Sequence, residues 1–202
     1  MCAFSKDDVK LGVIGCGKMA SAILGGVAKH KFLSADDIYV YDVNMDSSGS
    51  LCKEFGFREA YSIKDLAQNV DVILLAVKPF VVGEVLSELK EFYNEHLILS
   101  ILAGVKIKKY IEMIKNARVI RIMPNTPALV NEGASAICGN SNISNDELDF
   151  AFSLMSNCGK VIKTTEDKID IINLNKTAPL LHRSLVALEA IAAAGGKVLF
   201  VA

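Results

Sequence analysis

The stretch Val9–Ala20, VKLGVIGCGKMA, decides the fold, because a short apolar run leads directly into the pattern Gly15-x-Gly17-x-x-Ala20. This layout predicts a buried strand, a tight glycine turn and the start of a helix. In a dinucleotide-binding unit the first glycine makes the turn, the second lets the backbone approach a pyrophosphate, and the small third residue packs the helix closely. The N–H groups and dipole of the helix start then attract the phosphates. Glycine turns before helices are common in α/β proteins, so the motif needs support from the rest of the chain.

Length and composition favour one sizeable domain, alone or with a small appendage. The chain has 202 residues, of which 51% are apolar, and a formal net charge of −1. A protein that tracks a nucleic acid backbone needs a surplus of basic residues, so we expect no nucleic acid partner. No apolar run approaches the ~20 residues of a membrane helix, and the N-terminal MCAFSKDD lacks a signal-peptide core. We therefore expect no membrane association and a cytoplasmic location.

The five cysteines predict neither a disulfide framework nor a metal site. They are scattered and lack C-x-x-C spacing, at positions Cys2, Cys16, Cys52, Cys138 and Cys158. This usage is typical of a reducing, cytosolic compartment. Cys16 lies inside the glycine turn with no histidine near it in the sequence, so we expect a small filler there rather than a nucleophile.

Strand signals alternate with helix-length segments along most of the chain. This alternation predicts an α/β fold, with a Rossmann-type, doubly wound, mostly parallel sheet. The expected strands are Lys10–Ile14, Ile38–Tyr41, Phe57–Ala60, Val72–Ala76, Leu97–Ile101 and Val119–Met123. The fourth and fifth are continuously apolar, which is typical of strands that helices cover on both faces. We expect these two strands at the centre of the sheet.

The candidate site follows from the same topology, because ligands bind such sheets at the carboxyl ends of the strands. In Pro124–Pro127, two prolines around Asn125 and Thr126 predict a rigid turn with two hydrogen-bonding side chains, although a plain exit from the sheet also uses such residues. Lys78 alone is more typical of a surface lysine than of a ligand contact. The segments that follow the strands are Gly15–Met19, Asp42–Asn44, Val77–Pro79, Leu102–Gly104 and Pro124–Pro127.

Asp42 closes the second predicted strand, where an acidic side chain accepts hydrogen bonds from the adenosine ribose hydroxyls and repels a 2′-phosphate. No arginine stands beside it in the sequence. The pattern therefore favours NADH over NADPH. A solvated aspartate that begins a turn is the alternative interpretation of this residue.

Several segments together resemble pyrroline-5-carboxylate reductase, the last enzyme of proline biosynthesis. They are IGCGKMA, AVKP, LAG, VIRIMPNTPALVNEGASAIC and CGKV followed by DKIDII, from about Lys10 to Ile172. MPNTPALV-x-EGASA is the most specific of them, and the spacing between the segments matches as well. The resemblance implies a Rossmann domain that binds NAD(P)H, followed by a helical domain that dimerises and shapes the substrate site. It also implies hydride transfer to the C=N carbon of a cyclic imino acid, 1-pyrroline-5-carboxylate, which gives L-proline.

The resemblance further implies roles for individual residues. Asn125 would lie near the nicotinamide, and Glu166 would contact the substrate near its ring nitrogen, where a carboxylate favours the protonated, more electrophilic iminium. An exposed residue in the first turn of a helix is the alternative for Glu166. The pyrophosphate would be held by Gly15, Cys16, Gly17, Lys18 and Met19, the ribose would face Asp42, and the cofactor would be lined by Ala76, Val77, Lys78, Pro79 and Ala103.

The C-terminal part departs from the family pattern. Residues 173–183 read NLNKTAPLLHR where the family has a serine- and glycine-rich SGSGPAY turn, and the chain stops at Ala202 without the family's remaining helices. We expect a Rossmann domain over residues 1–164 and a helical segment, a truncated remnant of the dimerisation and substrate domain, over residues 165–202. Apolar residues at helical spacing predict an amphipathic helix there, and its pairing would make a homo-oligomer. Thr177 and Arg183 either replace the hydrogen-bond donors that the family's turn offers to the substrate carboxylate, or have no such role. In the second case Arg183 would lie on the polar face of the amphipathic helix.

The sequence thus predicts an oxidoreductase that reduces 1-pyrroline-5-carboxylate. Two other interpretations stay open. An inactive dinucleotide-binding or regulatory relative agrees with the altered C-terminal part. Another small NAD(P)-dependent reductase, of the hydroxy-acid type, shares the glycine motif, but MPNTPALV and AVKP argue against it.

Overall fold

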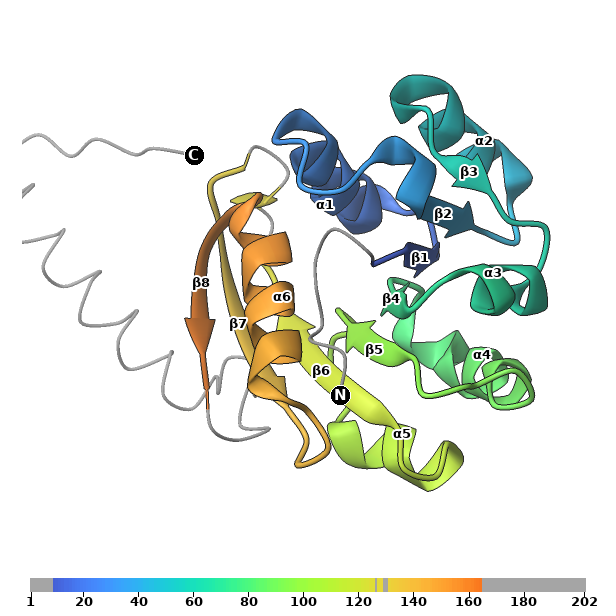
Figure 1. Ribbon diagram of the computed structural model, residues 1–202, viewed down its shortest axis with the longest axis vertical. Coiled ribbons are helices and arrows are strands. Elements are labelled where there is room, and N and C mark those ends of the chain that lie inside the picture. Colours follow the sequence, from blue (N-terminus) through green and yellow to red (C-terminus); the bar gives the residue numbers. More distant parts are fainter. Residues whose placement is uncertain (1–8, 126, 129–130, 165–202) are drawn as a thin grey trace, which may run out of the picture. The chain divides into compact units, whose positions relative to one another are not determined.

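The computed structural model describes residues 9–125, 127–128 and 131–164 (Figure 1). These residues form an eight-stranded sheet with the strand order β3-β2-β1-β4-β5-β6-β7-β8. The strands are β1 (Leu11–Ile14), β2 (Ile38–Tyr41), β3 (Arg58–Glu59), β4 (Val72–Leu75), β5 (Leu97–Ser100), β6 (Arg118–Met123), β7 (Gly133–Gly139) and β8 (Gly159–Lys163).

The first six strands confirm the predicted Rossmann-type sheet. Strands β1 to β6 all pair with one another in parallel, and the order 3-2-1-4-5-6 is that of a doubly wound dinucleotide-binding sheet. The order reverses between β1 and β4, which pair from Leu11 opposite Val72 to Ile14 opposite Leu75. The switch point therefore lies directly after Ile14, where the glycine turn begins.

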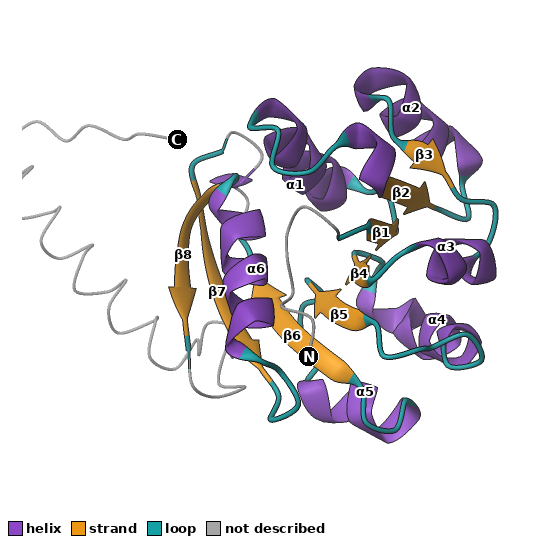
Figure 2. Cartoon of the chain, viewed as in Figure 1, coloured by secondary structure: helices purple, strands orange, loops and turns teal. Residues whose placement is uncertain are grey.

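Three of the described helices, α2, α3 and α6, begin at capping side chains. Asn44 accepts a hydrogen bond from the Asp46 N–H at the start of α2, and Ser62 accepts one from Asp65 at the start of α3. Ser144 and Glu147 form a reciprocal capping box on α6. Figure 2 shows the helices in purple, alongside the orange strands of the sheet. They are α1 (Lys18–Lys29), α2 (Met45–Phe55), α3 (Ile63–Asn69), α4 (Val82–Leu89), α5 (Ile107–Met113) and α6 (Asn145–Ser156), with short 3-10 turns η2 (Ala35–Asp37) and η3 (Pro79–Val81).

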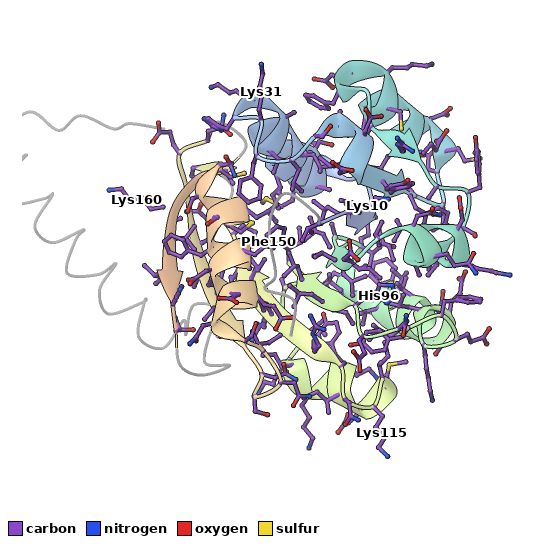
Figure 3. The ribbon with its side chains drawn as sticks, viewed as in Figure 1. Lys10, Lys31, His96, Lys115, Phe150 and Lys160 are labelled. Carbon is purple, nitrogen blue, oxygen red and sulfur yellow. The ribbon has the colours of Figure 1, made fainter. Side chains whose placement is uncertain are left out.

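Two apolar layers cover the two faces of the sheet. Helices α1, α2 and α6 pack on one face, and Phe150 of α6 belongs to that layer (Figure 3). Helices α3, α4 and α5 pack on the other face. Successive residues of β4 alternate between the layers, with Val72 and Leu74 in the first and Ile73 and Leu75 in the second. The expected central position of β4 and β5 is confirmed, because both strands are buried throughout.

Two strands were not expected from the sequence. β7 reads GASAICG, whose small residues carry a weak strand signal, and it forms because it pairs antiparallel with β6 and buries Ile137 and Cys138. β8 reads GKVIK and pairs parallel with β7. It is an edge strand, and Ile162 is 62% exposed. Strand β3 is shorter than expected, at Arg58–Glu59 rather than Phe57–Ala60.

The described part of the chain ends at Thr164, the predicted end of the Rossmann domain. The helical segment expected over residues 165–202, with Glu166, Thr177 and Arg183, lies outside the described residues, so that division of the chain stays a prediction. None of the described helices has the length and apolarity that crossing a membrane requires.

Candidate functional site

The glycine turn lies at the switch point of the sheet. Gly15 has a φ of +96°, and a Cβ built on it would stand 2.8 Å from the carbonyl carbon and oxygen of Ala76. Its N–H donates to the Tyr41 carbonyl oxygen at 2.8 Å. Only glycine tolerates this conformation and this close approach to the end of β4 at low cost. The turn is thus fixed between the ends of β2 and β4.

Gly17, two residues further along the turn, lies in open space, whereas Gly15 is crowded by the Ala76 backbone. It is exposed, and a Cβ built on it would meet nothing within 4 Å. As the N-cap residue of α1 it makes no side-chain hydrogen bond, and the first turn of α1 contains no acidic residue. The helix start therefore presents backbone N–H groups that no side chain caps, which is the local structure that binds pyrophosphate oxygens.

Asp42 follows β2 and contacts the turn directly. Its Oδ2 accepts a hydrogen bond from the Cys16 N–H at 2.7 Å, and its Oδ1 accepts one from the Asn44 N–H at 2.9 Å. The carboxylate therefore positions the turn from the end of the neighbouring strand. Each carboxylate oxygen keeps acceptor capacity beyond one hydrogen bond, so this contact is compatible with the predicted ribose contact.

Cys16 is a buried filler, as predicted. Its side chain is 6% exposed. Burial, and next the neighbouring carboxylate of Asp42, raise the pKa of the Cys16 thiol to about 12. A thiol with this pKa carries almost no thiolate at neutral pH, so it is a poor nucleophile.

A cavity of about 300 Å³ opens beside the turn. It brings together Gly15, Asp42 and Val77, three of the predicted cofactor residues, at the ends of β1, β2 and β4. Among the described residues that line it, none is a lysine or an arginine. Its walls are mostly apolar, and its other lining residues are Ile14, Tyr41, Val43, Ile63, Val81, Glu84, Val85 and Glu88.

A second hollow, of about 630 Å³, runs along α1 from the same turn. Cys16, Gly17 and Lys18 line its beginning, and Asn131 from the connection between β6 and β7 lies against it. Met19, in contrast, is partly buried against the apolar core. Its side chain therefore packs inside the domain, and any pyrophosphate contact of Met19 comes from its backbone.

The other predicted residues lie at the ends of β4, β5 and β6 without lining either hollow. Ala76 is tied to β1 by its N–H, which donates to the Ile14 carbonyl at 2.9 Å. Lys78 is exposed, and its ammonium stands 5.9 Å from the centre of the Phe80 ring. Pro79 begins η3, and Ala103 is exposed after β5. These positions agree with a strand-end site, and the contacts that the resemblance implies for them remain predictions.

Asn125 has a structural contact that the sequence did not indicate. It is exposed after β6, and its side-chain Oδ1 accepts a hydrogen bond from the Ala134 N–H of β7 at 2.8 Å. The side chain therefore ties the end of β6 to β7 through its oxygen, and its predicted place near the nicotinamide stays a prediction. Glu166 lies outside the described residues.

Sequence analysis missed the residues that close the cavity from the side of α4. Glu84 and Glu88 are one helical turn apart, as are Val81 and Val85. That spacing places each pair on one side of a helix. The four-residue spacing is therefore visible in the sequence after β4. Only the strand order shows that this side of α4 faces the switch point of the sheet.

Comparison with known proteins shows the family. The family described as "NADP oxidoreductase coenzyme F420-dependent" matches residues 10–104. The pyrroline-5-carboxylate reductase of Escherichia coli is 39% identical over 140 residues, which are 68% of this chain and 52% of that protein. The pyrroline-5-carboxylate reductase of Glycine max is 34% identical over 188 residues, which are 92% of this chain and 68% of that protein. The chain belongs to the pyrroline-5-carboxylate reductase family.

Solved structures of the family share the fold. A pyrroline-5-carboxylate reductase from Coxiella burnetii aligns with a TM-score of 0.78 and 25% identity, over 92% of this chain and 72% of that one. The Plasmodium falciparum pyrroline carboxylate reductase with NADP bound aligns with a TM-score of 0.74 and 27% identity, over 96% of this chain and 72% of that one. Against the E. coli and G. max reductases, the chain spans between 52% and 68% of the relative's length.

Proposed function

We propose that this protein reduces 1-pyrroline-5-carboxylate to L-proline with NAD(P)H. The observation that carries the proposal is the glycine turn at the β1–β4 switch point, in a chain of the pyrroline-5-carboxylate reductase family. When bound, the reduced nicotinamide supplies a hydride to the C=N carbon, and the ring nitrogen ends as the amine of proline with a proton from solvent. This reaction balances without a metal or a further reductant.

The residues of the turn fit a dinucleotide. The uncapped N–H groups at the start of α1 bind the pyrophosphate, and the open space at Gly17 admits it. The family resemblance implies that Asn125 would lie near the nicotinamide and that Glu166, outside the described residues, would lie near the iminium nitrogen. These groups hold imine and nicotinamide face to face, and such positioning alone contributes several kcal/mol, of the order of 7–11 in favourable cases.

We further propose that NADH is preferred over NADPH. The carboxylates of Asp42, Glu84 and Glu88 line the cavity beside the turn, and the described lining residues include no lysine or arginine. A 2′-phosphate placed there would meet like charges with no cation to pair with. A cytoplasmic location and a homo-oligomer also remain predictions.

The test is oxidation of NADH and, separately, NADPH by the purified 202-residue chain in the presence of 1-pyrroline-5-carboxylate. We expect turnover that depends on the imine and a higher kcat/KM with NADH. Gly17→Val, whose Cβ would meet nothing within 4 Å in the protein itself, serves as the control that loses activity. Binding of NADH without turnover of the imine would support the inactive relative instead. If a parallel assay with a 2-oxo acid gave turnover and the imine gave none, the hydroxy-acid reductase would be supported.

A further inference from the structure

The cavity beside the glycine turn combines apolar walls with an acidic side. Val43, Ile63 and Val77 belong to the apolar walls and come from three different connections of the sheet. Glu84 and Glu88, both exposed on α4, supply the acidic side. An apolar slot with a few polar groups at its edge is suited to a flat heteroaromatic ring that carries hydrogen-bonding groups.

Asp42 indicates which part of the cofactor enters this cavity. Under the proposed function, on which this inference rests, Asp42 faces the adenosine ribose. Asp42 also lines the cavity. The base attached to that ribose therefore has the cavity next to it, while the pyrophosphate leads away toward Gly17 and the start of α1.

The chemistry of the acidic side decides which base fits. Ionised carboxylates only accept hydrogen bonds, and adenine carries an exocyclic amine with two N–H donors. Hypoxanthine has a carbonyl oxygen at the same position, which would face the carboxylates as a second acceptor. Glu88 also lies close enough to Tyr41 to contribute to the raised pKa of that phenol, after the larger effect of burial. Glu88 is thus placed toward the end of β2, where the ribose begins.

We propose that Glu84 and Glu88 recognise the exocyclic amine of adenine, so that the site selects adenine dinucleotides over their deaminated analogues. The two residues are specificity determinants in the base site, remote from the reacting atoms. They accept hydrogen bonds from the amine while the valines enclose the ring.

The test compares NADH with reduced nicotinamide hypoxanthine dinucleotide, which has a carbonyl in place of the exocyclic amine and an N–H at the adjacent N1. Binding is titrated by the fluorescence of the reduced nicotinamide. We expect the wild-type chain to bind NADH about fivefold to tenfold more tightly, as one hydrogen bond to a partly solvated carboxylate allows. In the Glu84→Gln/Glu88→Gln double variant the ratio should fall below about twofold, because a glutamine amide both donates and accepts.

Single variants and a matched control complete the experiment. Glu84→Gln and Glu88→Gln separately assign the selectivity to one or both residues. Glu91→Gln removes an exposed carboxylate just beyond α4 that does not line the cavity, so it should leave the ratio as in the wild type.

Two results would overturn the inference while leaving the proposed function intact. They are equal binding of both dinucleotides by the wild type, and a double variant that keeps the wild-type ratio. A chain that binds neither dinucleotide would refute the proposed function and this inference together. Imine reduction with NADH but without selectivity for the base would refute this inference alone.

Discussion

At the scale of single residues, the two glycines of the turn differ in role: one is needed for folding, and the other is proposed to serve ligand binding. Gly15 is required by the fold, because its φ of +96° and the Ala76 backbone 2.8 Å from a built Cβ leave no room for a side chain. A Cβ at Gly17 would meet nothing within 4 Å, so the fold does not require glycine there, and we attribute this glycine to the proposed pyrophosphate. The sequence motif marks both positions equally, and only the structure distinguishes the two reasons.

Gly17→Val should abolish dinucleotide binding without affecting stability. The added branched side chain would occupy the space of the proposed pyrophosphate, and its Cβ would meet no other protein atom within 4 Å. We expect an unfolding midpoint close to that of the wild type and no change in nicotinamide fluorescence on titration with NADH. Unchanged affinity in a folded variant would place the phosphate site elsewhere.

Gly15→Ala should show the opposite behaviour and destabilise the protein. The positive φ and the contact with Ala76 together cost about 2 kcal/mol or more. Chemical unfolding measures this loss, with Gly17→Ala as the matched control, which should stay within about 1 kcal/mol of the wild type. A similar loss for both variants would contradict the distinction between the two glycines.

Asp42→Ala should affect both the turn and the choice of cofactor. The variant leaves the N–H groups of Cys16 and Asn44 without their acceptor, which should cost about 1–2 kcal/mol of unfolding free energy. It also removes the charge that opposes a 2′-phosphate. We expect weaker binding of NADH and an affinity ratio shifted toward NADPH. An unchanged ratio in titrations with both dinucleotides would mean that Asp42 acts on the turn alone.

The surroundings of His96 predict that the free energy of unfolding decreases at mildly acidic pH. Its Nδ1 accepts from the Asn94 N–H at 3.1 Å and its Nε2 donates to the Ala67 carbonyl at 2.8 Å, so the ring is held neutral just before β5 (Figure 3). Burial lowers the pKa of His96, against the smaller raising effects of the Ala67 carbonyl and Asp71. The unfolded chain therefore takes up this proton first as the pH falls.

The unfolding free energy contributed by His96 should be fully present above about pH 6.5, the ordinary histidine pKa, and decrease as the pH falls below it. Urea unfolding at a series of pH values measures this dependence. His96→Gln keeps a donor and an acceptor but does not titrate, so its stability should depend less steeply on pH in that range. Parallel curves for the two proteins would rule out His96 as the titrating group.

At the scale of elements, β7 and β8 show where sequence reasoning was insufficient. The strands of the parallel sheet other than β3 are wholly or largely apolar, and all six were expected close to their observed bounds. β7 has small residues and glycines at both ends, and it becomes a strand through pairing with β6 and through Ile137 and Cys138 in the core. Such pairing depends on long-range contacts, which local sequence patterns do not encode.

Helix α6 is fixed to the sheet through its first turn. Glu147, with a side chain 5% exposed, accepts from the Ser144 N–H at 2.7 Å and also pairs with Arg118 of β6. The same carboxylate thus caps the helix and neutralises a cation whose side chain is 28% exposed. The capping pattern Ser144-x-x-Glu147 can be read from the sequence, but the ion pair across to β6 cannot.

Replacement of Glu147 should therefore cost more than replacement of its capping partner. We expect Ser144→Ala to lower the unfolding free energy by about 1 kcal/mol. Glu147→Ala should lower it by about 2–3 kcal/mol, because it also leaves the half-buried Arg118 without its carboxylate. Equal losses in urea unfolding would mean that the Arg118–Glu147 pair contributes nothing beyond the cap.

At the scale of the whole molecule, the glycine motif and the alternation of strands and helices predicted the parallel sheet and the end at which its ligands bind. Gly15, Asp42 and Val77 were expected together and do meet at one cavity. Glu84, Glu88 and the hydrogen bond between Asn125 and Ala134 were not expected, because they depend on how α4 and β7 pack. The family resemblance supplied Glu166, which lies outside the described residues.

Hydride transfer itself is the most direct test of the account. The full chain is incubated with 1-pyrroline-5-carboxylate and NADH carrying deuterium at both positions of nicotinamide C4, and the product is examined by mass spectrometry. We predict L-proline with one deuterium, on the carbon that was double-bonded to nitrogen, and none with the Gly17→Val variant. Failure to form labelled proline, with NADH shown to bind the same preparation, would contradict the proposed reaction.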